Sequence, residues 1–184
     1  MKFIYGLPPS DPIPQKKYNE WDSHQFNNKH LVLGLLTGFV LTLITEQVIR
    51  FTFFEGAYSF TFARHIYLLL LIVPAHEGIH MLLLPGYKNI SAGLSLRKMI
   101  VYVHTEDILT RSRFLTVSLA PLVLLTLTPL LLLSVYPHPL LGHIALYNLI
   151  GSGGDLISAA QILHLPRHSL LKMSGNELLV KPVR

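Results

Sequence analysis

Four long hydrophobic runs alternate with polar segments along the chain. They cover residues 31–49, 66–84, 114–135 and 140–163, and only a few charged residues interrupt them. Each run has about the 20 residues that a helix needs to cross the ~30 Å hydrocarbon layer of a membrane. The pattern therefore predicts an all-α polytopic membrane protein with four transmembrane helices.

The polar segments at the two ends suggest how the chain is organised. Residues 1–30 are polar and rich in proline, and they lack the apolar core of a secretory signal peptide. We expect them to form an uncleaved N-terminal tail, residues 31–163 to form the four-helix transmembrane domain, and residues 164–184 to form a C-terminal tail.

Short β-strands are expected outside the predicted helices. Residues 93–105 (GLSLRKMIVYVHT) alternate in polarity and contain β-branched and aromatic residues, which is typical of one or two strands. We place this β-like segment at the membrane surface, between the second and third helices. Residues 174–182 (SGNELLVKP) read as a turn followed by another short strand.

The composition supports a membrane protein. Hydrophobic residues make up 51% of the chain and charged residues 14%, whereas a soluble domain has roughly 25% charged residues. A chain of this size cannot bury so much apolar surface within itself. The absence of cysteine excludes a disulfide framework and any thiolate-ligated metal site.

The distribution of positive charge predicts an orientation. The net charge is +5, and all lysines and arginines except Arg50 and Arg64 lie before residue 31, between residues 85 and 113, or after residue 163. With four helices these three segments share one side, which the positive-inside rule assigns to the cytoplasm. Both termini are therefore expected in the cytoplasm. Because the positions of the basic residues are explained by the orientation of the protein in the lipid bilayer, no nucleic-acid partner is expected.

The second run contains the motif His76-Glu77-Gly78-Ile79-His80, an HExxH sequence. Positions i and i+4 lie on one face of a helix, so both imidazoles can reach one tetrahedral zinc ion. Glu77 would then lie beside the metal and act as general base on a zinc-bound water. Ionisable groups within a membrane are costly and persist where they pair or ligate. The alternative is a polar patch that joins helices by hydrogen bonds.

Asp155 is the expected third ligand. It lies 15 residues into the fourth run, and His80 lies 14 residues into the second, so both fall at similar depths if the helices start level. Gly153 and Gly154 would permit close helix approach or local unwinding, and so could serve the substrate or support the ligands. Asn148 could bind substrate or form an interhelical hydrogen bond. The alternative is a small-residue packing seam in which the Asp pairs with a nearby cation.

These motifs carry a family resemblance. HEGIH in one transmembrane segment, followed by an Asp in a later Gly-rich segment (NLIGSGGD), resembles the site-2 protease class of intramembrane zinc metalloproteases. The chain resembles more closely a family of small bacterial membrane proteins described as zincin peptidases of unknown function. The similarity covers residues 31–163, and it implies a location in the bacterial cytoplasmic membrane.

The resemblance also assigns roles to residues. It implies that His76, His80 and Asp155 hold zinc and that Glu77 is the catalytic base. An Asn several residues before the Asp is typical of site-2 proteases, and Asn148 stands in that place.

Zinc-dependent hydrolysis of peptide bonds is therefore the expected function. The substrate would be a transmembrane or membrane-adjacent peptide, and the strand at residues 94–104 could align it by edge pairing. The alternative is a non-enzymatic membrane protein, such as a scaffold or transporter-like subunit, with a structural metal. Structural zinc usually has four protein ligands, so the three found here favour an open, catalytic position.

Overall fold

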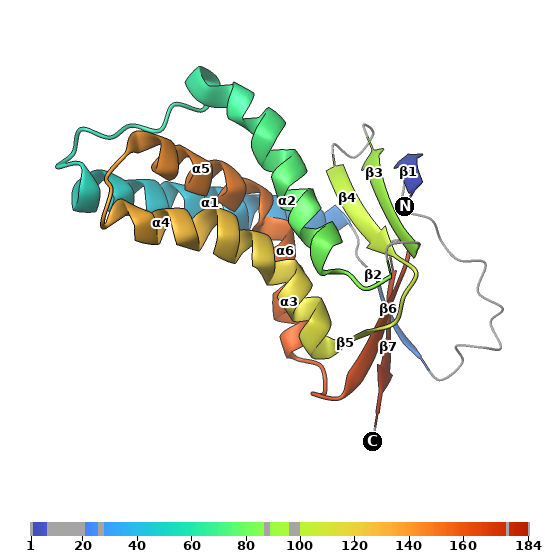
Figure 1. The fold of residues 1–184 in the computed structure, drawn as a ribbon. Coiled ribbons are helices and arrows are strands. Elements are labelled where there is room, and N and C mark those ends of the chain that lie inside the picture. Colours follow the sequence, from blue (N-terminus) through green and yellow to red (C-terminus); the bar gives the residue numbers. More distant parts are fainter. Residues whose placement is uncertain are drawn as a thin grey trace.

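Helices gather at one end of the molecule and two small β-sheets lie at the other, as the computed structural model shows (Figure 1). The structure describes residues 2–6, 21–25, 28–86, 89–95, 100–175 and 177–183. The helical elements are α1 (Asn28–Phe53), η2 (Phe62–Leu68), α2 (Leu69–Leu83), α3 (Arg111–Leu122), η4 (Val123–Leu127), α4 (Thr128–Leu133), α5 (Pro139–Gly151) and α6 (Gly153–Leu163).

Three helical segments of the described chain are long and apolar enough to cross a membrane. They are Lys29–Phe53, His65–Leu83 and Arg111–Leu133. The second joins η2 to α2, and the third joins α3, a π-helical turn (η4) and α4. These segments coincide with the first three predicted helices. The expectation of four continuous spans is wrong.

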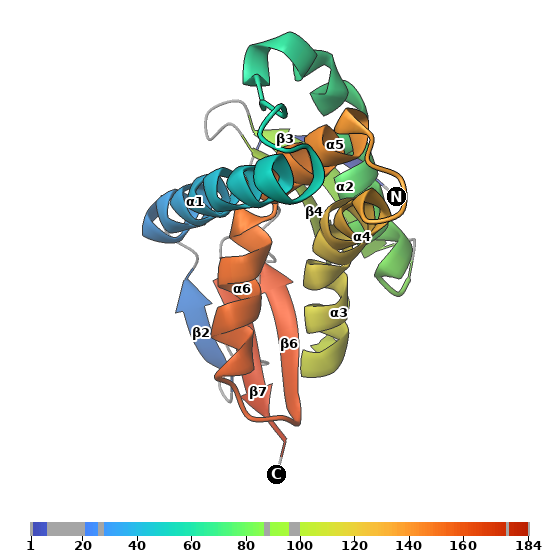
Figure 2. The same ribbon diagram turned by 90° about the vertical axis from the view of Figure 1, so that its left-hand side faces the viewer.

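The fourth hydrophobic run is broken at Ser152. Helix α5 ends at Gly151 and α6 begins at Gly153. The Ser152 hydroxyl and amide both donate to the carbonyl of Asn148, at 3.0 and 2.9 Å. Glycine on both sides lowers the local helix propensity by up to about 1 kcal/mol per residue relative to alanine. As a result α6 turns away from the direction of α5 (Figure 2).

Two sheets contradict the all-α prediction. One has the strand order β1-β3-β4 and the other β2-β7-β6-β5. Strand β1 is parallel to β3, and the other pairs are antiparallel. The strands are β1 (Lys2–Tyr5), β2 (Asp22–Gln25), β3 (Ile90–Ser95), β4 (Ile100–Thr105), β5 (Leu109–Thr110), β6 (Ser169–Ser174) and β7 (Glu177–Pro182).

The sequence anticipated only some of these strands. Strands β3 and β4 occupy the predicted β-like segment, of which residues 96–99 lie outside the described part, and β7 follows the predicted turn. The strands of the expected N-terminal tail have only four residues each, which is too short for a clear alternation. These two strands pair with strands far along the chain: β1 pairs with β3, and β2 pairs with β7.

A hydrophobic cluster joins the helix ends to the sheets. Its buried members come from the ends of α2 and α6, from the start of α3 and from strands of both sheets. Burial of such side chains stabilises the fold by roughly 1.5–3 kcal/mol each. The cluster therefore fixes α2 and α6 relative to α3. Its buried members include Leu84, Leu109, Phe114, Ile162, Leu171 and Val180.

Two arginines at the start of α3 add polar connections between the same helices. Arg111 donates from Nε to the Ile162 carbonyl (2.9 Å) and from Nη2 to the Leu163 carbonyl (2.7 Å), at the end of α6. Arg113 donates to the Leu83 carbonyl at the end of α2. The last carbonyls of a helix lack partners within it and carry partial negative charge, so a guanidinium is a suitable partner.

Helix α1 packs closely against the break between α5 and α6. A Cβ atom at Gly153 would lie 2.8 Å from the Gly38 nitrogen and would overlap the Gly34 carbonyl oxygen. A Cβ at Gly38 would meet the carbonyl oxygens of Leu149 and Ile150. The glycines let the backbones touch, and so hold the start of α6 in place.

Candidate metal centre

Three potential ligands converge between α2 and α6. His76 and His80 lie one turn apart on α2, and their Nε2 atoms are 3.1 Å apart. Asp155 Oδ2 lies 3.0 Å from His76 Nε2, and Oδ1 lies 3.5 Å from His80 Nε2. One ligand atom from each residue falls within a group whose members are all within 4.8 Å of one another.

These spacings fit a tetrahedral zinc ion. Ligand atoms about 2.0–2.1 Å from zinc stand about 3.3 Å apart at the corners of a tetrahedron. His76 Nε2 lies 3.1 Å from His80 Nε2 and 3.0 Å from Asp155 Oδ2, which is close to that separation, and the 3.5 Å contact of His80 Nε2 is with the other carboxylate oxygen, Oδ1. Two imidazoles and one carboxylate are also an established donor set for catalytic zinc, with the fourth corner left to water or substrate.

Hydrogen bonds to the outer ring nitrogens set the tautomer of both histidines. His76 Nδ1 lies 2.9 Å from Asn148 Oδ1, and His80 Nδ1 lies 2.9 Å from the Val117 carbonyl oxygen. Both oxygens can only accept, so each Nδ1 carries the hydrogen. In the neutral rings Nε2 is then the basic nitrogen. Such bonds orient metal-binding histidines and make them stronger ligands.

Asn148 is held rigidly in this role. It is 1% exposed, and its Nδ2 donates toward the Pro121 carbonyl (3.0 Å) and the hydroxyls of Thr126 (2.9 Å) and Ser152 (3.1 Å). Since the amide nitrogen faces these acceptors, the amide oxygen must face His76. The break at Ser152 therefore contributes directly to the orientation of a ligand.

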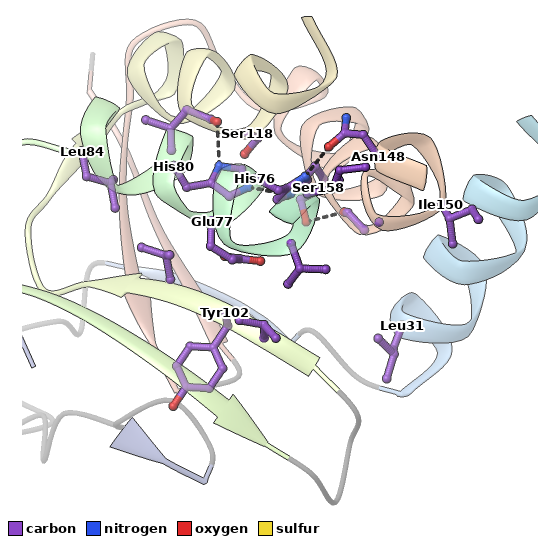
Figure 3. A pocket seen from close by; sticks show the side chains of 18 of the residues that line it. Leu31, His76, Glu77, His80, Leu84, Tyr102, Ser118, Asn148, Ile150 and Ser158 are labelled. Atoms are coloured by element: carbon purple, nitrogen blue, oxygen red, sulfur yellow. Dashed lines mark hydrogen bonds and ion pairs between the residues drawn. The ribbon is translucent and has the colours of Figure 1, made fainter. Parts of the chain in front are cut away.

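The centre opens into a cavity of about 450 Å³ between the helices and the first sheet. Glu77 lines this cavity and points from α2 toward the strands (Figure 3). Leu31 and Ile150 lie at one side of it. Most of the other lining residues are apolar, so the carboxylate of Glu77 stands out as a polar group beside the three ligands.

Within the described part of the chain, strand β4 pairs with β3 alone, and its other edge is called the free edge below. It is an edge strand of its sheet, and Val101 and Val103 line the cavity. The Glu106 amide donates to the carbonyl of Asn89, the residue opposite it. In an antiparallel pair every second residue bonds to the partner strand, so the backbone groups of residues 101 and 103 point away from β3. Leu94, which lies opposite Val101, agrees with this assignment, because its carbonyl accepts from the Gly6 amide on the β1 side and so points away from β4.

Tyr102, the residue between these two valines, packs its ring against β3. The ring lies over Gly93 and leaves no space for a side chain there. Burial raises the pKa of the Tyr102 phenol above its ordinary value, so the group stays neutral at physiological pH.

The structure brings together most of the residues that the sequence singled out, with one exception. His76, His80 and Asp155 converge, Asn148 contacts His76, and Glu77 and Gly154 line the cavity beside them. Gly153 is separated from this group because it packs against α1.

Sequence reasoning missed the other groups that hold the ligands in place. These are the Val117 carbonyl, which gives no side-chain signal, and Pro121, Thr126 and Ser152. Of these, only Pro121 stands out in the sequence, because proline is unusual inside a hydrophobic run that is expected to be helical.

One comparison with known proteins identifies a family. A profile of the family DUF3267, described as "Putative zincin peptidase", matches residues 69–170, which is more than half of the 184-residue chain. The match includes all three converging ligands and Glu77. Comparison with curated proteins and with solved structures gave no significant match.

Proposed function

Since the chain belongs to this zincin peptidase family, we propose that it is a zinc-dependent intramembrane metallopeptidase. The observation that carries the proposal is the convergence of His76, His80 and Asp155, whose ligand atoms lie within 4.8 Å of one another and form a donor set that zinc favours. The fourth corner, left without a protein ligand among the described residues, suits a catalytic centre better than a structural one.

The chain's own residues would divide the chemistry as follows. Zinc held by His76, His80 and Asp155 would act as a Lewis acid, which would lower the pKa of water toward about 7 and polarise a carbonyl. Glu77 takes the proton from the attacking water and passes it to the leaving amine. The Nδ1 hydrogen bonds of His76 and His80 keep both rings oriented throughout, so little reorganisation accompanies the reaction.

A site within the bilayer is supported by the surface of the helices. Helix α1 exposes a nearly continuous apolar surface, and α2 and α4 expose further leucines. In water a patch of this size would be unfavourable, whereas lipid tails cover it at no cost. The distribution of lysine and arginine favours cytoplasmic termini. Exposed side chains on α1 include Val32, Leu36, Phe39, Val40, Leu43 and Ile44.

The free edge of β4 suggests how a substrate is held. An extended peptide beside this strand would bond to the backbone groups of residues 101 and 103, next to Glu77 and the ligands. Backbone pairing requires no particular side chains. Pairing with β4 also requires that this part of the substrate is not helical. The substrate class would therefore be a transmembrane or membrane-adjacent protein with a locally extended stretch.

Metal content and peptide hydrolysis test the proposal together. Purified protein in detergent is expected to hold about one zinc per chain, His76→Ala to lose it, and Glu77→Gln to keep it. A pool of extended peptides incubated with each protein, with products identified by mass spectrometry, should be cut by the wild type and left intact by Glu77→Gln. Full activity of Glu77→Gln, or a wild type that binds no zinc, would contradict the proposal.

A further inference from the structure

Pro121 lies in an unusual place for a proline. It is buried near the C-terminal end of α3, within the helix and not in its first turn. A proline in a helix interior lacks the N–H that would bond to the carbonyl four residues earlier, and costs about 3 kcal/mol or more. For Pro121 that carbonyl belongs to Val117. A proline that costs this much free energy of folding at a buried site is expected to have a compensating role.

The carbonyl of Val117 has a different partner. It accepts the Nδ1 hydrogen of His80 at 2.9 Å, and this bond directs His80 Nε2 toward the other ligands. In a regular helix the amide of residue 121 would occupy the same oxygen. The missing N–H of Pro121 leaves the oxygen available to the histidine.

Pro121 also acts on the other histidine through its own carbonyl. That oxygen accepts a hydrogen from Asn148 Nδ2 at 3.0 Å, which helps to turn Asn148 Oδ1 toward His76 Nδ1. The helix changes directly after this point, because residues Val123–Leu127 form a π-helical turn in which the Thr128 amide bonds to Val123, five residues back. Irregular turns of this kind often occur at functional sites.

We propose that Pro121 is a positioning residue of the metal centre, which reserves the Val117 carbonyl for His80 and supports Asn148 against His76. This inference rests on the proposed function, because it requires His76 and His80 to be metal ligands. It goes beyond that function by assigning the orientation of both histidines to a residue that contacts neither metal nor substrate.

The substitution Pro121→Ala tests the inference because it restores the N–H. The new amide would compete with His80 for the Val117 carbonyl, so zinc affinity is expected to fall by about 10–100-fold, as is typical when such supporting bonds are lost. The stability of the metal-free protein should stay the same or rise, since a backbone hydrogen bond is gained. A packing role predicts the opposite, a loss of stability with zinc affinity unchanged.

Zinc affinity would be measured by competition with a chelator, and the ligand geometry by the visible spectrum of the Co²⁺-substituted protein. Thermal unfolding of the metal-free form reports stability. Pro121→Val is a second variant, which also restores the N–H and fills more of the proline's volume. Pro129→Ala is the matched control, because Pro129 is buried on the same helical run, in α4, and contacts none of the ligands.

The possible results separate the two proposals. Weaker zinc binding and an altered Co²⁺ spectrum in both Pro121 variants, with Pro129→Ala unchanged, would support the inference. Wild-type affinity in either folded Pro121 variant, or unfolding of both variants while Pro129→Ala folds, would overturn the inference alone. A wild type without zinc would overturn the proposed function and the inference with it.

Discussion

Two neighbouring glycines at the start of α6 offer a sharp test of how α1 supports the metal centre. Gly153 is buried against α1, where a Cβ would lie 2.8 Å from Gly38 N and 2.9 Å from Gly34 C. Non-bonded heavy atoms in contact normally stand about 3.5–4.0 Å apart, and the Cβ would also overlap the Gly34 carbonyl oxygen, so Gly153→Ala must push the helices apart by about an ångström or more. A Cβ at Gly154 would meet nothing within 4 Å.

The expected effects have opposite signs. Overpacking costs about 1–3 kcal/mol or more, so Gly153→Ala should lower Tm by about 2–12 °C, because 1 kcal/mol corresponds to about 2–4 °C for a chain of this size. Gly154→Ala removes a flexible residue from a helix and should stabilise by up to about 1 kcal/mol. Thermal unfolding in one detergent compares the two variants with the wild type. Equal Tm values for Gly153→Ala and the wild type would refute the close contact with α1.

Two further predictions concern α3 and β4. Arg111→Lys should lower the free energy of unfolding by about 1–2 kcal/mol, because lysine cannot supply the two directed bonds to the end of α6; an unchanged Tm would contradict this role. Val103→Pro should abolish peptide hydrolysis while zinc stays bound, because the amide it removes points to the free edge and not to β3. Val103→Ala keeps that amide and should retain activity; if both variants are equally impaired, edge pairing is not the cause.

The sequence predicted the convergence of His76, His80 and Asp155 better than it predicted the architecture. Regular spacing on one helix determines where His76 and His80 point, so their convergence follows from the motif alone. The position of Asp155 followed from comparing depths along two hydrophobic runs. That comparison of depths assumed level, straight helices, yet Asp155 in the fourth run still reaches the histidines because α6 begins only two residues before it.

The missed features depend on contacts between distant segments. The glycines near residue 153 predicted close helix approach or local unwinding, but hydropathy along residues 140–163 does not place the bend at Ser152, where Ser152 bonds to Asn148 and Gly153 contacts α1. The partner of His80 is a backbone oxygen, and any residue at position 117 would supply one. The N-terminal strands form only because partners near residues 91–94 and 177–180 are present.

Strand β2 can pair only after β7 has been synthesised. Asp22 lies opposite Val180 in β7, which is 158 residues further along the chain. Such distant pairing closes late in folding, since the intervening chain must first be brought together. Helix α6, which carries Asp155, leads directly into β6 of the same sheet. A growing chain therefore already holds the HEGIH helix before it has the sheet that follows Asp155, so the candidate centre is completed only after β6 and β7 have been synthesised.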